Sequence, residues 1–503
     1  MTAARPFPSW KVMLNFIVGA AWALFLICLP VTSFPYLPKA FGGVALVRPL
    51  SIYPLLLLLL LVTLPRLFSR HIPKTIYTLL PFILIAVASS LLSTLRGIEP
   101  MLGVSVSERV VRALLTLGIG CAFYFTVALL PRTPDDLRLS LRWLYLGFIL
   151  ALIWGSLQAV YVLHFTPHYF QFLSRIQEYI STRKIFDNRI SGMTYEPNWF
   201  AEQISCMLLP WLLAAVLSGT SIFSWRWRKV TVEWILLVWS VIILVLTFSR
   251  AGLANLVLLL LLSLLFFRKQ HAHKAVKVRT SMAVWTRRIL EIGLVAVILA
   301  GLVYAASSKN AFFSRIWNYW KDVSVRSLSG YFDYIGFGAR LMYADAAYNT
   351  YTAYPVLGVG LGNYAFYFEE MLPDQPLATT PEILRILTPE VGRNRLVTPK
   401  NFYYRILAET GLLGMAAFAA FFIAVLGCAL YLWFSSEPQL HYWGMAGLFG
   451  LLAFLASGFS FDSFALPNMW VIFGLITSAT WIFARQEVPA DGSIAQIIVK
   501  GEI

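Results

Sequence analysis

The sequence predicts an all-helical protein that crosses a membrane many times, and three observations support this. Hydrophobic residues make up 59% of the 503 residues and charged residues only 13%, and the mean hydropathy is +0.72. This composition excludes an ordinary water-soluble globule. Apolar stretches such as those centred on 52–62 and 253–265 are, with their flanks, long enough to cross hydrocarbon as helices. They lack the alternation of barrel strands, so only helices satisfy the bilayer.

Taken in order, the apolar stretches predict about twelve transmembrane helices. These lie near residues 12–30, 47–65, 75–94, 111–130, 140–163, 199–218, 231–248, 251–267, 289–306, 408–432, 441–459 and 466–484. We expect no cleaved signal peptide, because the first apolar run continues past signal-peptide length without a clear small-residue cleavage site. The four cysteines fall inside apolar stretches and have neither disulfide nor zinc spacing.

Lysine and arginine are distributed unevenly over the expected connections. The connection 268–288 alone holds seven of them, whereas the short connections on the other side are poorer. The positive-inside rule therefore places both termini in the cytoplasm. It places two longer polar loops outside, His164–Asn198 and the large loop 307–405 between the ninth and tenth helices. We attribute the net charge of +16 to this topology and to anionic membrane lipid, and not to nucleic-acid binding.

The chain accordingly divides into three parts. Residues 1–306 would form the first nine helices, 307–405 the outer loop, and 406–503 the last three helices with a cytoplasmic tail. Loops as long as 307–405 are uncommon in compact folds and are usually functional, so we expect the site there. An amphipathic piece at Phe312–Trp320 is expected to lie in the membrane interface.

The first polar motif lies at 246–252, where the seventh helix ends and the eighth begins. Ser249 is a plausible helix cap, which puts Arg250 at the positive end of the helix dipole. Arg250 either extends to the interface as a solvated charge or forms an anion site together with the helix end.

The second motif, 189–202, leads into the sixth helix. The step Glu196–Asn198 reads as a turn and a helix start. In the simplest interpretation Asn198 caps that helix and Arg189 is a loop charge. The alternative is that both side chains bind a ligand.

The third motif is Arg340, on a helical stretch followed by Pro355 and by glycines at 358, 360 and 362. These glycines do not form a dinucleotide fingerprint, because no βαβ unit surrounds them. They indicate a tight backbone path close to a ligand or the membrane. Taken alone, Arg340 is more simply interpreted as a solvated charge than as a binding residue.

The fourth motif, 398–414, enters the tenth helix. Thr398 as cap and Pro399 as first residue predict the helix start. Asn401, Arg405 and Glu409 then share one helix face. Arg405 and Glu409 either pair with each other or face a functional cavity, as ionisable residues near membrane helices usually do.

Together the four motifs resemble the O-antigen ligase and O-antigen polymerase superfamily of bacterial membrane glycosyltransferases. The resemblance covers roughly residues 185–415 and rests on 247–250, 189–201, 355–363 after Arg340, and 401–411. It implies a polyprenyl-diphosphate-linked glycan as donor and a sugar hydroxyl on a glycan or lipid-linked acceptor. It implies that transfer takes place at the outer side of the bacterial cytoplasmic (inner) membrane, without a metal or other cofactor, in the synthesis of a cell-surface polysaccharide.

The residues give this chemistry a physical basis. Breaking a sugar–diphosphate bond leaves negative charge on the diphosphate, which preorganised cations stabilise. We therefore expect Arg189, Arg250 and Arg340 to bind the diphosphate, with Asn198 and Asn401 as further substrate-binding residues.

Transfer also requires a group that deprotonates the acceptor. Family members often carry histidine immediately before the asparagine, and this chain has Lys400 there instead. Glu196, Glu409 and His168 remain candidates for the base, or no strong base is needed. Lys400 would act in catalysis or as another phosphate cation.

The competing class is a transporter or exporter, for which about twelve helices is a common number. Transporters usually show two similar halves and midplane binding groups. No such repeat is evident, and the polar residues gather at the expected outer edge.

Overall fold

The protein is almost entirely helical, as the sequence predicts. We describe a computed structural model at residues 10–36, 47–69, 71–228, 230–272, 300–301, 304, 310–322, 324, 327–373, 381–388 and 396–487. Within these ranges the only sheet is a short hairpin of β1 (Arg226–Trp227) and β2 (Val230–Thr231). The fold class is therefore confirmed as all-α.

The first half of the chain supplies most of the long helices. In order these are α1 (Trp10–Ile27), α2 (Ile52–Leu58), η2 (Leu59–Thr63), α3 (Leu64–Leu67), η3 (Lys74–Leu79), α4 (Leu80–Ser93), α5 (Val106–Leu129), α6 (Pro134–Leu163), α7 (Pro167–Ile180), α8 (Pro197–Gln203), η4 (Ile204–Leu208), α9 (Leu209–Ser218), α10 (Val232–Leu246) and α11 (Arg250–Ala272). The π-helical turns η2 and η4 continue α2 and α8 without a break, so each series forms one longer rod.

The second half begins with short helices and ends with three long ones. These are α13 (Ala311–Asp322), α14 (Leu328–Tyr334), α15 (Gly338–Ala353), α16 (Tyr364–Tyr367), α17 (Pro381–Leu387), α18 (Phe402–Phe434), α19 (Pro438–Ser457) and α20 (Pro467–Glu487). The segment 307–405 is thus not structureless: where the structure describes it, it consists largely of helices.

Eight helices are long and apolar enough to cross a membrane: Trp10–Ile27, Lys74–Ser93, Val106–Leu129, Pro134–Leu163, Pro197–Ser218, Phe402–Phe434, Pro438–Ser457 and Pro467–Gln486. Three shorter apolar helices span Ile52–Leu67, Val232–Leu246 and Arg250–Leu264. Together they overlap every predicted transmembrane segment except the ninth, 289–306, which lies almost wholly outside the described residues. The total of about twelve therefore stays a prediction.

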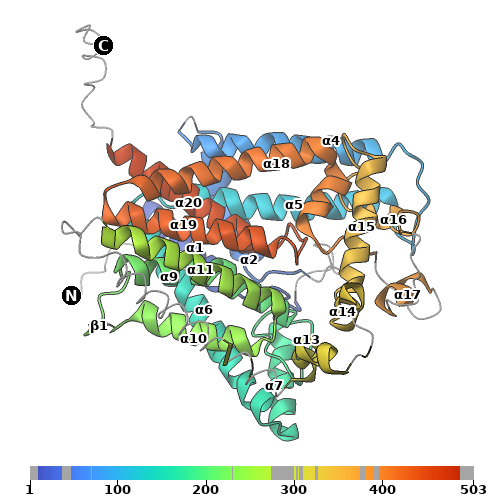
Figure 1. Cartoon of the computed structure of the whole chain (residues 1–503). Coiled ribbons are helices and arrows are strands. Elements are labelled where there is room, and N and C mark those ends of the chain that lie inside the picture. The colour runs from blue at the N-terminus through green and yellow to red at the C-terminus, as the bar shows by residue number, and fades with distance from the viewer. Residues whose placement is uncertain are drawn as a thin grey trace, which may run out of the picture.

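The long helices form a bundle with two distinct ends (Figure 1). We call the end that carries α14–α17 the loop end, and the end where α3, α5 and α20 finish the basic end. Buried aromatic rings from α4, α18 and the α19–α20 turn fill the interior near the loop end; Phe402 lies 5.2 Å from Phe418 and 5.2 Å from Phe464. This packing holds the start of α18 in the bundle.

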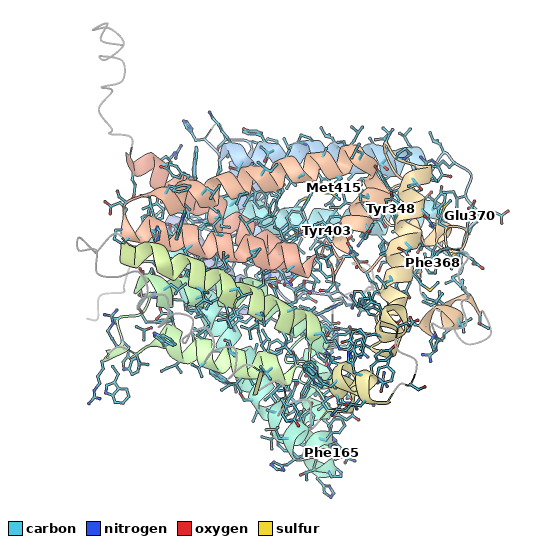
Figure 2. The ribbon with its side chains drawn as sticks, in the orientation of Figure 1. Phe165, Tyr348, Phe368, Glu370, Tyr403 and Met415 are labelled. Carbon is cyan, nitrogen blue, oxygen red and sulfur yellow. The ribbon has the colours of Figure 1, made fainter. Side chains whose placement is uncertain are left out.

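The α6–α7 turn projects beyond the bundle. Its Phe165 is 57% exposed and lies at the tip of the molecule (Figure 2). In α13, Trp317 and Trp320 are exposed while Tyr319 is buried. This one-sided exposure agrees with the expected interfacial position of Phe312–Trp320.

Helix α18 starts later than the sequence predicts. Thr398 and Pro399 precede the helix, because Lys400 has a left-handed φ of 51° and Asn401 is the cap instead. The Asn401 Oδ1 accepts from the backbone N–H groups of Tyr403 and Tyr404, at 3.0 and 3.2 Å. The expected cap at Thr398 is therefore wrong. A left-handed residue cannot continue a right-handed helix through Pro399.

Within α18 the helix is interrupted at Gly411, where φ is 66° and ψ is −167°. The segment 355–360 lies against this break and bonds to its backbone. Val359 N and Gly360 N donate to the carbonyls of Ala408 and Glu409, each at 2.9 Å, and Leu412 N donates to Pro355 O at 2.8 Å. The glycine-rich path is thus tight because it lies against α18.

The same glycines have almost no space for a side chain. A Cβ on Gly358 would lie 2.5 Å from Ala408 O, and one on Gly411 would lie 2.3 Å from Val356 O. The backbone path is tight, as predicted, and the neighbour that the structure shows is the backbone of α18.

We predict that Gly411→Ala destabilises the folded protein, since it combines a strained left-handed backbone, costing on the order of 1–3 kcal/mol, with a clash against Val356 O. The measurement is the thermal unfolding midpoint of the purified protein in detergent. Gly427→Ala in the same helix is the matched control, because a Cβ at Gly427 meets nothing within 4 Å. Equal midpoints for the two variants would contradict the prediction.

Candidate active site at the loop end

Arg189 and Arg250 come from separate parts of the chain and lie near each other. Arg189, in the loop before α8, donates from Nε to Thr247 O at 2.9 Å and from a terminal nitrogen to Asn198 Oδ1 at 2.8 Å. Burial lowers the pKa of Arg189 to about 10; Glu196 opposes this shift and the nearby Arg250 adds to it. We call Arg189 and Arg250 the arginine pair.

The local sequence fixes Arg250 at the start of α11. Ser249 Oγ accepts from Gly252 N at 3.2 Å, which confirms the predicted cap. Gly252 has room for no side chain, since a Cβ there would lie 2.6 Å from the Ala201 Cβ of α8. Helix α8 therefore packs closely on the first turn of α11 and keeps Asn198 and the arginine pair together. The Arg250 guanidinium also donates to Ile335 O, just before α15.

The two predicted outer loops touch each other beside this pair. Asn310 Nδ2 donates to Asn188 O at 2.6 Å, and the Phe248 and Phe313 rings lie 5.9 Å apart. The first contact links Asn310, just before α13, to the residue before Arg189. The second links Phe313 of α13 to the turn before Arg250. The loops 164–198 and 307–405 thus meet at one place.

Arg340 lies on α15 and reaches the turn between α19 and α20. One terminal nitrogen donates to Ser460 O at 3.0 Å. Its charge also acts on two carboxylates, Glu202 of α8 and Glu382 of α17. Since Asn198 and Glu202 are one turn apart on α8, this short helix links Arg340 to the arginine pair.

Lys400 is already engaged by protein groups. Its ammonium pairs with Glu382 at 2.5 Å and lies 4.3 Å from the centre of the Tyr343 ring. Its backbone N–H donates to Asp462 Oδ2 at 2.7 Å. Burial alone would raise the pKa of Glu382, but Lys400 and the Tyr343 hydroxyl outweigh it and hold that pKa below its ordinary value.

Helix α15 is fixed by an aromatic cluster that also holds the Lys400 contact. The Tyr343 ring lies 5.4 Å from Phe368, which sits beside α15 (Figure 2). Both rings are buried. Arg340, Tyr343 and the partners of Lys400 therefore belong to one rigid unit.

Arg405 and Glu409 form a buried ion pair. Nε of Arg405 lies 2.9 Å from Glu409 Oε2, with the side chains only 8% and 1% exposed. Arg405 also donates to Asp462 O and lies over the Phe464 ring. Of the two interpretations of this helix face, the structure favours the internal pair, so the Glu409 carboxylate is committed to Arg405.

Glu196 is the most accessible of the predicted acidic site residues. It occupies the cap position of α8 and pairs with Arg183 at 2.7 Å, with both side chains 37% exposed. Its charge acts on Arg189. His168, by contrast, is exposed in the first turn of α7, and no contact joins it to the arginine pair among the interactions described above.

Two acidic residues that the sequence analysis did not select also lie at the loop end. Glu202 is buried on α8. Asp462 contacts Lys400 and Arg405 from the α19–α20 turn. The signal that could have identified them is an acidic residue inside or beside an apolar helix, which usually marks a site.

Within the described ranges, no three His, Cys, Asp or Glu side chains gather so that they could ligate a metal ion. The loop end does bring together cations from four segments, each with oxygen partners, and several carboxylates. Fold and site together define a polytopic helical membrane protein with an arginine-rich site at one end.

Residues 235–419 match the family model described as O-antigen ligase. This match confirms the resemblance to the O-antigen ligase superfamily and indicates a membrane protein that acts in glycan ligation or polymerisation. The matched segment runs from α10 into α18 and includes Arg250, Arg340, Lys400 and Glu409. Arg189, Glu196 and Asn198 precede it. No curated protein sequence matches the chain.

We predict that Arg405→Leu lowers the free energy of unfolding by about 3–5 kcal/mol, because it leaves Glu409 buried and unpaired. Arg112→Leu is the control, since its pair with Glu108 is 41% and 45% exposed. An exposed pair contributes only about 0–1 kcal/mol. Denaturant unfolding in detergent measures both.

The double variant Arg405→Leu with Glu409→Leu separates charge burial from lost packing. It should recover much of the stability lost in Arg405→Leu, because no unpaired carboxylate remains. If the double variant is as unstable as the single one, the ion pair is not the cause.

Proposed function

We propose that this protein is a membrane glycosyltransferase that moves a polyprenyl-diphosphate-linked glycan onto a sugar hydroxyl of a glycan or lipid-linked acceptor. The observation that carries the proposal is the proximity of Arg189 and Arg250, with Asn198 of α8 hydrogen-bonded to Arg189. Two guanidinium groups from distant segments repel each other, and a dianionic ligand between them would relieve that repulsion. The O-antigen ligase family match supports the glycan substrate class.

In this proposal the arginine pair binds the diphosphate of the donor. Guanidinium groups match phosphate oxygens with paired N–H donors, and the amino end of α11 adds backbone N–H groups beside Arg250. When the bond between the anomeric carbon and the diphosphate oxygen breaks, the electron pair stays on the diphosphate. Cations already in place then stabilise the charge that develops. Arg340 and Lys400, in the neighbouring unit around α15, would bind the remaining phosphate oxygens or the glycan. Asn401, next to Lys400, would contact the same ligand.

The acceptor hydroxyl must lose a proton as it attacks the anomeric carbon. We assign this role to Glu196, because it combines partial exposure with a position beside Arg189. Glu409 is less suitable, since it is buried and paired with Arg405. The Arg183 partner of Glu196 would hold the carboxylate in position until the acceptor arrives.

We further propose that the loop end faces outward from a bacterial cytoplasmic membrane and that both termini are cytoplasmic. The support is the basic end, which carries a series of arginines: Arg66, Arg132, Arg138, Arg142, Arg226, Arg228 and Arg485. Arginine-rich connections stay on the cytoplasmic side. The glycan donor and acceptor would then meet the site from the outer leaflet.

A transporter is the alternative function. Transporters hold their binding groups near the membrane midplane, between two similar halves. Here the candidate binding groups lie at one end, beside surface helices α13–α17 (Figure 1). This placement favours chemistry at the membrane surface over passage through it.

We predict that Arg250→Ala lowers the rate of glycan transfer by about 10²-fold or more while the protein remains folded and inserted. The assay uses the purified protein, reconstituted with polyprenyl-diphosphate-linked oligosaccharide and candidate acceptors. Arg112→Ala, an arginine at the same end in an exposed pair, is the control and should keep its activity. Normal transfer by Arg250→Ala would refute the assignment.

A second prediction concerns the base. Glu196→Gln should slow transfer by about 10²–10⁴-fold and leave donor binding unchanged. Glu178→Gln, on exposed α7 of the same loop, is the control. A variant that loses donor binding along with rate would show that Glu196 only positions Arg183 or Arg189.

A further inference from the structure

A second charged site lies at the basic end, far from the arginine pair. A cavity of about 540 Å³ opens between the end of α3, the turn after α5 and the last turns of α20. Its walls carry the basic side chains Arg66, Arg132, Arg485 and His71. This volume is in the range of small-ligand sites.

None of the three arginines forms an ion pair with a carboxylate in the part of the chain that the structure describes. Arg66 donates instead to the carbonyls of Leu129 and Leu130 at the end of α5, the latter at 3.0 Å. It lies close enough to Arg132 for the two charges to repel each other. The nearest acid, Asp136, is engaged by the backbone N–H groups of Arg132 and Thr133, at 2.9 and 3.0 Å. The cavity therefore concentrates positive charge.

Most of the other lining residues are apolar. Among them, Leu129 belongs to the last turn of α5, and Trp481 and Ile482 belong to α20. The Arg485 guanidinium lies 4.1 Å from the centre of the Trp481 ring, which fixes it at the rim. The cavity thus combines charged and apolar side chains at the level where apolar helices end. This combination matches a lipid, which has an anionic headgroup and apolar chains.

We propose that this cavity binds one anionic phospholipid, with its phosphate between Arg132 and Arg485 and its upper acyl chain along Trp481 and Leu129. A phosphodiester accepts several guanidinium hydrogen bonds at once, which satisfies the donors that no protein carboxylate meets. Phosphate without an acyl chain would share only the polar half of these contacts. The inference goes beyond the proposed transfer reaction and does not depend on it.

The test measures lipid retention by native mass spectrometry of the purified full-length protein in an uncharged detergent. Phosphatidylglycerol and phosphatidylcholine vesicle extracts are added in parallel. We expect phosphatidylglycerol to bind, and its affinity to fall about tenfold or more in the double variant Arg132→Gln with Arg485→Gln. Arg66 is left unchanged because it caps α5.

Arg226→Gln with Arg228→Gln is the matched control. It removes the same charge from exposed positions at the same end but outside the cavity, and should retain phosphatidylglycerol. Equal loss in both double variants would overturn the proposal, as would equal binding of phosphatidylcholine. Inorganic phosphate is the third arm: if it displaces phosphatidylglycerol completely at equal concentration, the site recognises free phosphate and the lipid assignment fails. Elution volume in size-exclusion chromatography confirms folding.

Discussion

The loop end depends on how the backbone is satisfied where α18 breaks at Gly411. Inside a bilayer an unpaired N–H or C=O costs several kcal/mol, so a helix can break only where other protein groups take over. Segment 355–360 does so, pairing with Ala408, Glu409 and Leu412. Ser89 of α4 adds a hydroxyl donor to Glu409 O at 3.0 Å. The glycines at 358 and 411 permit this close contact, and the contact in turn fixes Arg405, the α19–α20 turn and α15.

Burial and ion pairing distinguish the charges that stabilise the fold from those at the candidate site. Arg405 and Glu409 neutralise each other in the interior, whereas the hydrogen bonds described above for Arg189 and Arg250 go to the neutral oxygens Thr247 O, Asn198 Oδ1 and Ile335 O. A carbonyl satisfies a guanidinium N–H without cancelling its charge. In the proposed transfer reaction, contacts of this kind would position the two guanidinium groups without cancelling their charge.

Hydropathy predicted the helices well, because the bilayer imposes length and composition on each segment independently. The helix start at Thr398 was predicted wrongly. Lys400 is left-handed and its N–H bonds to Asp462, a residue distant in the sequence, so that Asn401 becomes the cap. The sequence singled out Arg189 and Arg250, but their proximity depends on α8 packing against Gly252. Glu202 and Asp462 carried a signal in the sequence, an acidic residue inside or beside an apolar helix, but only the fold brings them near Arg340 and Lys400.

The contact between Asn310 and Asn188 bears on how this architecture can be divided. The segment that matches the family, 235–419, carries Arg250, whereas its companion Arg189 precedes it. The match boundary therefore cuts through the arginine pair. Exchange of that segment between homologues would join two parts of the site that come from different proteins. Only chimaeras that keep the contact between Asn310 and Asn188 would then be expected to keep the arginine pair together.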